Sequence, residues 1–79
     1  MIKYNIKELI AKKRFEEKRL ITITDVADEI GVTRTTLSKI ANSHGSYSTK
    51  TEYIEKLCHY FECPVEDVMT ILPDEETDD

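Results

Sequence analysis

Apolar residues recur at intervals of three and four along most of the chain, the spacing typical of amphipathic helices. No stretch alternates apolar and polar residues over a length typical of a strand. The start and stop signals along the chain are also those of helices. The pattern therefore predicts an all-α fold with five helices.

The first predicted helix begins at Asn5, because Asn5 followed by Glu8 resembles a capping box. Apolar residues then occupy one side, with one more just upstream: Ile2, Ile6, Leu9 and Ile10. The apolar pattern fades after Lys13. Two alternatives stay open, in which the helix ends near Arg14 or continues to about Lys18 as an exposed arm.

Two short helices follow, joined by a tight turn. Thr22 with Asp25 marks the start of the second helix, Gly31 is a left-handed stop, and Thr33 caps the third. The predicted inward residues of the pair are Val26, Ala27, Ile30, Val32, Leu37, Ile40 and Ala41. A small Ala27 lets the third helix cross close to the second, so the spacing predicts two helices packed at a steep angle.

The rest of the chain predicts a loop over residues 42–48 and two further helices. Thr49 and Glu52 resemble a capping box for the fourth helix, and Pro64 opens a short fifth helix that Pro73 closes. The predicted buried stripe of the fourth helix is Tyr53, Ile54, Leu57, Tyr60 and Phe61. The apolar residues of the fifth are Val65, Val68, Met69 and Leu72.

A chain of 79 residues has material for one small core, so we expect a single domain over residues 1–73 and an acidic, solvated tail over residues 74–79. No apolar run could cross a bilayer, and the first residues are too polar for a signal peptide. A cytoplasmic location follows as an expectation. Cys58 and Cys63 are then interpreted as reduced, half-buried thiols, without the four ligands of a zinc site. We expect no metal, cofactor or small-molecule effector.

The net charge of −5 is unevenly divided along the chain. Residues 1–50 contain ten Lys and Arg against six Asp and Glu, which gives +4, and residues 51–79 contain one against ten, which gives −9. A basic front with an acidic back is compatible with a protein that meets phosphate with one face only.

The start of the third helix departs from the charge pattern of the others. Four predicted helices have an acid in the first turn, which complements the positive end of the helix dipole: Glu8, Asp25, Glu52, and Glu66 with Asp67. The third begins instead with Arg34, at a cost of roughly 0.3–1 kcal/mol. This exception suggests that the helix end is kept positive for an external anion such as DNA phosphate.

The predicted DNA-facing side chains follow if this end enters a major groove: Thr33, Arg34, Thr35, Ser38, Lys39 and Asn42. Arg34 and Lys39 can donate to guanine O6 and N7. Thr33 and Thr36 are better placed for phosphate or for the helix cap, and a purely capping Thr33 is an equal alternative. The alternative for Arg34 and Lys39 is that they are only solvated charges.

Residues 5–72 resemble the Cro/repressor-type helix-turn-helix family, also called XRE-like. Two segments carry the resemblance, residues 22–40 and residues 54–68, the second with its Leu-Cys and Cys-Pro motifs. The resemblance implies a compact five-helix, lambda-repressor-like domain that binds operators in double-stranded DNA as a homodimer. It also implies that this chain is a small transcriptional regulator, with a repressor favoured.

Carried over by residue, the resemblance assigns base contacts to Arg34, Thr35 and Lys39, and phosphate contacts to Thr36 and Asn42. Ile23 departs from the family because a phosphate-binding Gln often stands there, which leaves Thr22, Thr24 or backbone amides for that contact. Residues 14–21 are longer than usual, and residues 44–50 have fewer basic residues than usual. We therefore expect this chain to contact DNA phosphate more weakly than is typical of the family.

Three questions remain open at this point. Val68, Met69 and Leu72 either form an isologous dimer contact or close the core of the monomer. An enzyme is disfavoured because His44 and His59 have no catalytic partners at a convincing spacing. A protein-binding antitoxin or adaptor with the same fold is the main alternative to DNA binding.

Overall fold

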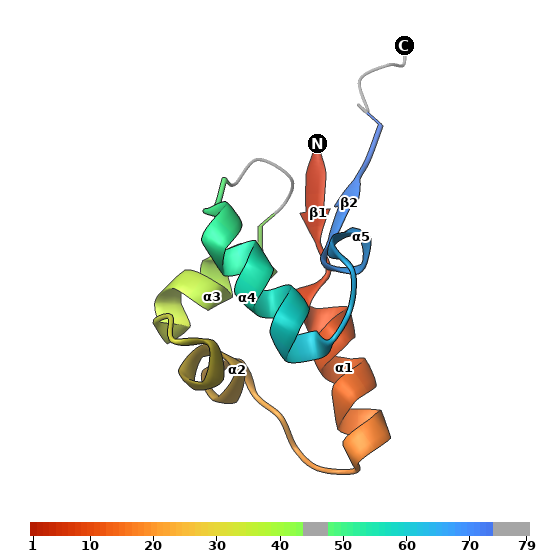
Figure 1. The fold of residues 1–79 in the computed structure, drawn as a ribbon, viewed down its shortest axis with the longest axis vertical. Helices are drawn as coiled ribbons and strands as arrows, with labels where there is room; N and C mark the ends of the chain where they lie inside the picture. The colour runs from red at the N-terminus through yellow and green to blue at the C-terminus, as the bar shows by residue number, and fades with distance from the viewer. Residues whose placement is uncertain (44–47, 74–79) are drawn as a thin grey trace.

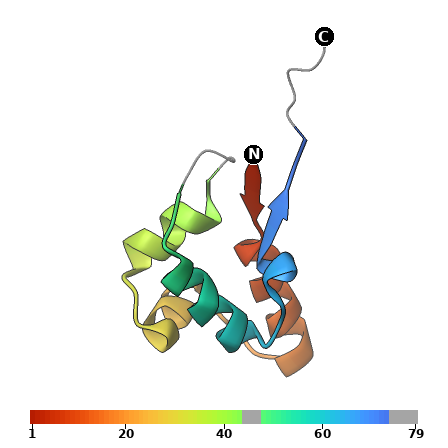
Figure 2. The same cartoon turned by 45° about the horizontal axis from the view of Figure 1, so that its top comes forward.

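The structure is a computed structural model that describes residues 1–43 and 48–73. Its elements in chain order are β1 (Ile2–Tyr4), α1 (Ile6–Glu17), α2 (Ile23–Ile30), α3 (Arg34–Ala41), α4 (Thr51–Phe61), α5 (Val65–Val68) and β2 (Met69–Ile71). Figures 1 and 2 show β1 and β2 side by side near the chain ends, with α2 and α3 on the side of the molecule away from α5.

The two strands correct the expected all-α fold. β1 and β2 form a two-stranded antiparallel sheet in which Lys3 lies opposite Thr70. Each strand has three residues, too few to show an alternating pattern, and more than 60 residues of sequence separate the partners. The fifth helix is correspondingly shorter than predicted, because Met69 is extended (φ −128°, ψ 140°) and continues into β2.

The predicted capping box at the start of α1 is wrong. Asn5 is the N-cap residue, but its side chain makes no cap hydrogen bond. Its Nδ2 instead donates to Asp67 O (3.2 Å) and to Thr70 Oγ1 (2.9 Å). Glu8 pairs with Lys3, whose hydrogen bond lowers the pKa of that carboxyl. Asn5 thus ties the start of α1 to the end of the domain, which is a contact that local sequence does not reveal.

Of the two alternatives for the end of α1, the longer helix is present. α1 continues to Glu17, and Lys18 follows in the left-handed region (φ 55°, ψ 42°). Glu17 accepts from Lys13 Nζ at 2.7 Å and from Arg19 Nε at 2.8 Å. Phe15 is 84% exposed, so the last turns of α1 form the exposed arm.

The start of α4 gives a second corrected cap. The N-cap is Lys50, without a side-chain cap bond, and not Thr49. Lys50 O accepts from the amides of Tyr53 and Ile54, so the helix begins without a hydroxyl cap. On the predicted stripe, Ile54 and Leu57 are buried and the three aromatic residues are half-buried.

One hydrophobic core joins all of these elements. Its buried members are Tyr4, Ile6, Ile10, Ile21, Val26, Ala27, Ile30, Leu37, Ile40, Ala41, Ile54, Leu57 and Val68. No buried side-chain nitrogen or oxygen in the described part of the chain lacks a hydrogen bond. None of the helices described is long and apolar enough to span a membrane.

Candidate nucleic-acid interface

Local signals fix both ends of α2. The predicted capping box is confirmed, since Asp25 N donates to Thr22 Oγ1 (3.2 Å) and Thr22 N donates to Asp25 Oδ2 (3.0 Å). Gly31 ends the helix in the left-handed region (φ 79°, ψ 32°). The amides of Gly31 and Val32 both donate to Ala27 O, at 2.9 and 3.0 Å, which turns the chain tightly toward α3.

The inner sides of α2 and α3 hold the pair together. Val26, Ala27 and Leu37 are fully buried, and Ile40 is 1% exposed. Ala27 carries only a methyl group, so it leaves room for α3 to pack against α2. The predicted inward residues of α2 and α3 are therefore confirmed, and their packing fixes which side of α3 faces outward.

The start of α3 is capped without any acidic residue. Thr33 Oγ1 accepts from Thr36 N (3.1 Å) and donates to Thr36 Oγ1 (2.9 Å). No acid lies in the first turn of α3, whereas α1, α2 and α4 each have one and α5 has two. The missing acid that the sequence indicated for the third helix is therefore also missing from the first turn of α3 in the structure. It leaves the positive end of the α3 dipole without a compensating carboxylate of its own.

The outward side chains of α3 combine exposed cations with small polar groups. Arg34, Thr35 and Lys39 are exposed. Within residues 1–43 and 48–73, neither Arg34 nor Lys39 forms an ion pair, so both cations are available to an external partner. Ser38 is half-buried, and Asn42 Nδ2 donates to Ser38 O (2.9 Å) and Oγ (3.1 Å).

Comparison with known proteins identifies the family of the whole domain. The family described as the Cro/C1-type HTH DNA-binding domain matches residues 5–74. The chain belongs to this family. No curated protein matches it.

The start of α2 carries an apolar residue between two threonines. Thr22 and Thr24 are exposed on either side of Ile23. Ile23 is partly buried against the core, which explains its apolar character. The Thr22 hydroxyl accepts the cap hydrogen bond from Asp25 N, whereas the Thr24 hydroxyl takes no part in the cap.

Lys50 is a candidate that the sequence reasoning did not single out. This exposed N-cap of α4 places its Nζ 5.6 Å from the centre of the Tyr53 ring. It is the only Lys or Arg between Lys39 and Lys56, and this position is the sequence feature that could have identified it as a candidate contact. Unlike α3, however, α4 has the acid Glu52 in its first turn, so the charge of Lys50 stands close in sequence to a carboxylate.

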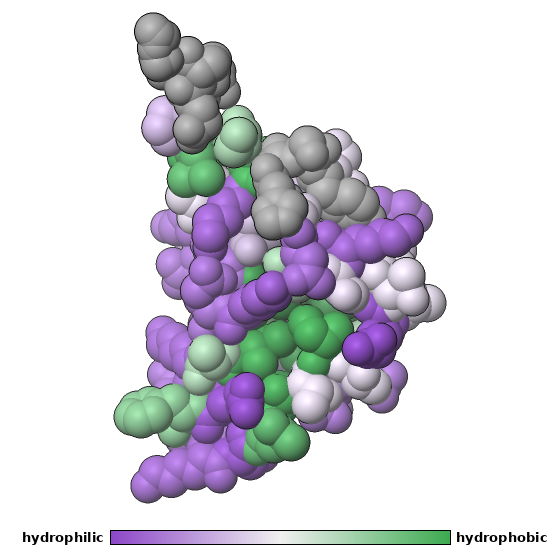
Figure 3. All heavy atoms as spheres, turned by 180° about the vertical axis from the view of Figure 1, so that it is seen from behind, coloured by the Kyte–Doolittle hydropathy of each residue, from purple (hydrophilic) through white to green (hydrophobic). Residues whose placement is uncertain are grey.

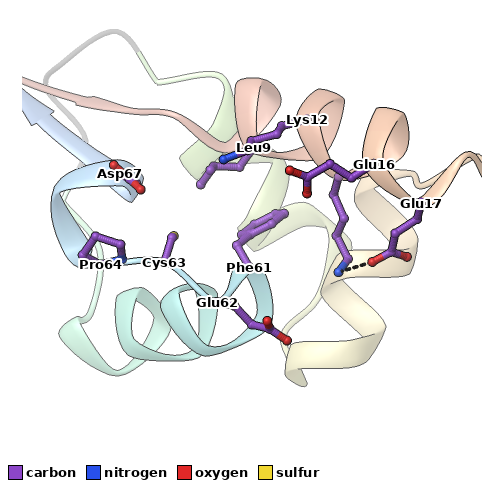
Figure 4. A pocket seen from close by; sticks show the side chains of 10 residues that line it. Leu9, Lys12, Glu16, Glu17, Phe61, Glu62, Cys63, Pro64 and Asp67 are labelled. Atoms are coloured by element: carbon purple, nitrogen blue, oxygen red, sulfur yellow. Dashed lines mark ion pairs between the residues drawn. The ribbon is translucent and has the colours of Figure 1, made fainter.

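The two cysteines do not form an activated nucleophile. Both are free and half-buried, as predicted, and Cys63 N donates to Cys58 O (3.1 Å) where α4 ends. Burial raises the pKa of both thiols, so they are protonated at neutral pH. Cys63 faces a cleft of about 220 Å³ between α1 and the α4–α5 connection, whose lining contains no histidine (Figure 4).

The three apolar residues considered for a dimer contact differ in how deeply they are buried. Val68 is fully buried, which agrees with the alternative in which it closes the core of the monomer. Met69 lies in β2 and is half-buried, and Leu72, just beyond β2, is half-buried as well. Only the latter two still present part of their surface to a partner.

Proposed function

We propose that this Cro/C1-type domain is a sequence-specific transcriptional regulator whose α3 enters the major groove of duplex DNA by its N-terminal end. The observation that carries the proposal is the exposed, unpaired Arg34 in an α3 first turn that lacks any acid. A cation costs stability there unless an anion meets it. Duplex DNA supplies both phosphates and acceptors on base edges.

The proposed readers of bases are the long or exposed side chains at the start of α3. Arg34 and Lys39 donate to guanine O6 and N7, and the Thr35 methyl packs on a thymine methyl. Ser38 is half-buried and bonded to Asn42, so its contribution is to hold that amide in place.

The proposed phosphate contacts flank this reading surface. They are Thr24, in the first turn of α2, and Lys50, the N-cap residue of α4. Thr36 and Asn42 add hydroxyl and amide groups, while Thr22 and Thr33 contribute mainly by capping their helices. Phosphate contacts position the domain, and the choice of sequence rests on Arg34, Thr35 and Lys39.

We further propose that a homodimer acts, and that it acts as a repressor. Two recognition helices on half-sites about 34 Å apart read a palindromic operator with one two-fold axis. A domain seated in the groove excludes other proteins from the same bases. Repression by occupancy therefore needs no further part of the molecule.

The test is selection of duplexes from a random pool, followed by binding measurements with single variants. Arg34→Ala and Lys39→Ala should each lose about 1–3 kcal/mol of discrimination at one base position while circular dichroism stays helical. Lys7→Ala, an exposed lysine on α1, is the matched control and should bind normally.

Unchanged sequence preference in both α3 variants would overturn this assignment and favour the adaptor alternative. That alternative has one observation behind it, the −9 charge of residues 51–79, which would suit a basic protein partner. An adaptor would ignore duplex DNA of every sequence even at low salt. The two functions are therefore separated by the selection experiment itself.

A further inference from the structure

The end of α4 brings the two cysteines of the chain close together along the main chain. Cys63 N donates to Cys58 O at 3.1 Å, and Glu62 N donates to His59 O at 3.3 Å. Glu62 lies in the left-handed region (φ 53°, ψ 52°). These features define a Schellman motif, in which the sixth residue bonds to the first and the fifth bonds to the second. Cys58 is the first residue of this motif and Cys63 is the sixth.

The spacing of the two cysteines is compatible with a disulfide. The 3.1 Å hydrogen bond and the covalent bonds next to it keep the Cα atoms of Cys58 and Cys63 within about 7 Å of each other. A disulfide usually joins residues whose Cα atoms are about 4.4–6.8 Å apart. The side chains at the first and sixth positions of a Schellman motif frequently form an apolar contact. Here both positions carry a thiol, and both thiols are half-buried against the hydrophobic core.

Both cysteines can also be reached from the surface. Cys63 lies in the lining of the cleft of about 220 Å³ between α1 and the α4–α5 connection (Figure 4), and Cys58 lines a recess of about 400 Å³ beside β2. Burial raises the pKa of the Cys63 thiol, and Cys58 raises that pKa further, which agrees with two thiols close together. A small reagent therefore has access to either sulfur.

We infer that Cys58 and Cys63 form a dithiol site that a small disulfide oxidises to an intramolecular disulfide, which links the end of α4 covalently to the α4–α5 connection. One cysteine, as its thiolate, attacks a sulfur of the small disulfide, which leaves a mixed disulfide on the protein and releases one small thiol. The second cysteine attacks the protein sulfur of the mixed disulfide and releases the other small thiol. The protein loses two hydrogen atoms and the small disulfide gains them. This inference does not depend on the proposed contact with DNA.

The probe for this site is hydroxyethyl disulfide in a buffer that also contains mercaptoethanol. Figure 3 shows apolar side chains gathered among hydrophilic ones on the face opposite to that in Figure 1, so an apolar reagent would also bind away from the cysteines. Besides burial, nearby carboxylates raise the pKa values of both thiols, so a neutral reagent avoids repulsion from them. The exchange has to be followed to equilibrium, because protonated thiols react slowly.

Mass spectrometry after alkylation of the free thiols gives the first result. At equilibrium the folded wild-type chain should be lighter by two hydrogens and carry no mercaptoethanol. In concentrated guanidinium chloride the Schellman motif is lost, and the ratio of internal to mixed disulfide should fall at least about tenfold. Cys58→Ser and Cys63→Ser are the control variants, and each should form only the mixed disulfide.

Hydrogen exchange gives the second result. The Cys63 amide exchanges with solvent when its bond to Cys58 O opens, so its exchange should slow at least about tenfold in the oxidised chain. The matched control is the Val32 amide, which bonds to Ala27 O in the same way at the end of α2, where there is no cysteine. Its exchange should change little.

Three outcomes would show that the inference is wrong. The first is an internal disulfide that is no more favoured in the folded chain than in guanidinium chloride. The second is a folded chain that carries two mixed disulfides at equilibrium. The third is an oxidised chain in which the Cys63 amide exchanges at least as fast as in the reduced chain, because the disulfide would then not hold the end of α4 closed.

Discussion

At the scale of single residues, Arg34 lowers the stability of the fold and provides the proposed contact with DNA. Arg34→Glu would give α3 the first-turn carboxylate that the other helices described have. We expect the free energy of unfolding to rise by about 0.3–1 kcal/mol in urea titrations at low salt. Duplex binding should be lost in the same buffer, because a carboxylate repels phosphate. Arg34→Gln should lie between the two, and an Arg34→Glu chain that binds the selected duplex as tightly as wild type would refute the role given to Arg34.

Residue by residue, the sequence predicted those caps whose partners are local. Thr22 and Thr33 bond amides three residues onward, so their caps can be read from the chain alone. Asn5 carries the same signal, yet its side chain is held by Asp67 and Thr70, more than 60 residues away. No local sequence pattern indicates hydrogen bonds to such distant residues, and this is why the predicted capping box at Asn5 is wrong.

At the scale of elements, the turn between α2 and α3 depends on one backbone conformation. Gly31 has φ 79°, and the nearest heavy atom to an added Cβ is Lys56 Nζ at 3.8 Å, so space is open. Gly31→Ala should therefore cost only the left-handed strain, roughly 1–2 kcal/mol. Denaturant unfolding would show a lower midpoint with an unchanged slope. Gly31→Asn is the control and should lose less, because Asn tolerates this region; equal losses would point to a steric cause instead.

Helices with strong local signals were predictable, and the strands were not. α2 and α3 combine caps, a left-handed glycine and a 3.6-residue apolar period, all within residues 22–41. β1 and β2 each offer three residues, and their stability comes from pairing with each other and packing on the core. The apolar residues of 69–72 fit a helical period equally well, so the sequence favoured a longer fifth helix.

At the scale of the whole molecule, the division of charge predicts how DNA binding responds to salt. The helices proposed to contact DNA lie in the half of the chain with net charge +4, whereas residues 51–79 carry −9. Salt screens the attraction between the positive half and DNA phosphate, with a Debye length of about 10 Å at 0.1 M.

Binding of the selected duplex can be measured from about 50 to about 200 mM salt. Binding should weaken at least about tenfold over this range, since each phosphate contact releases counterions. The matched control is Lys7→Ala, which should show the same dependence on salt as the wild-type chain. An affinity for duplex DNA that does not change between these salt concentrations would contradict contact between the positive half and phosphate.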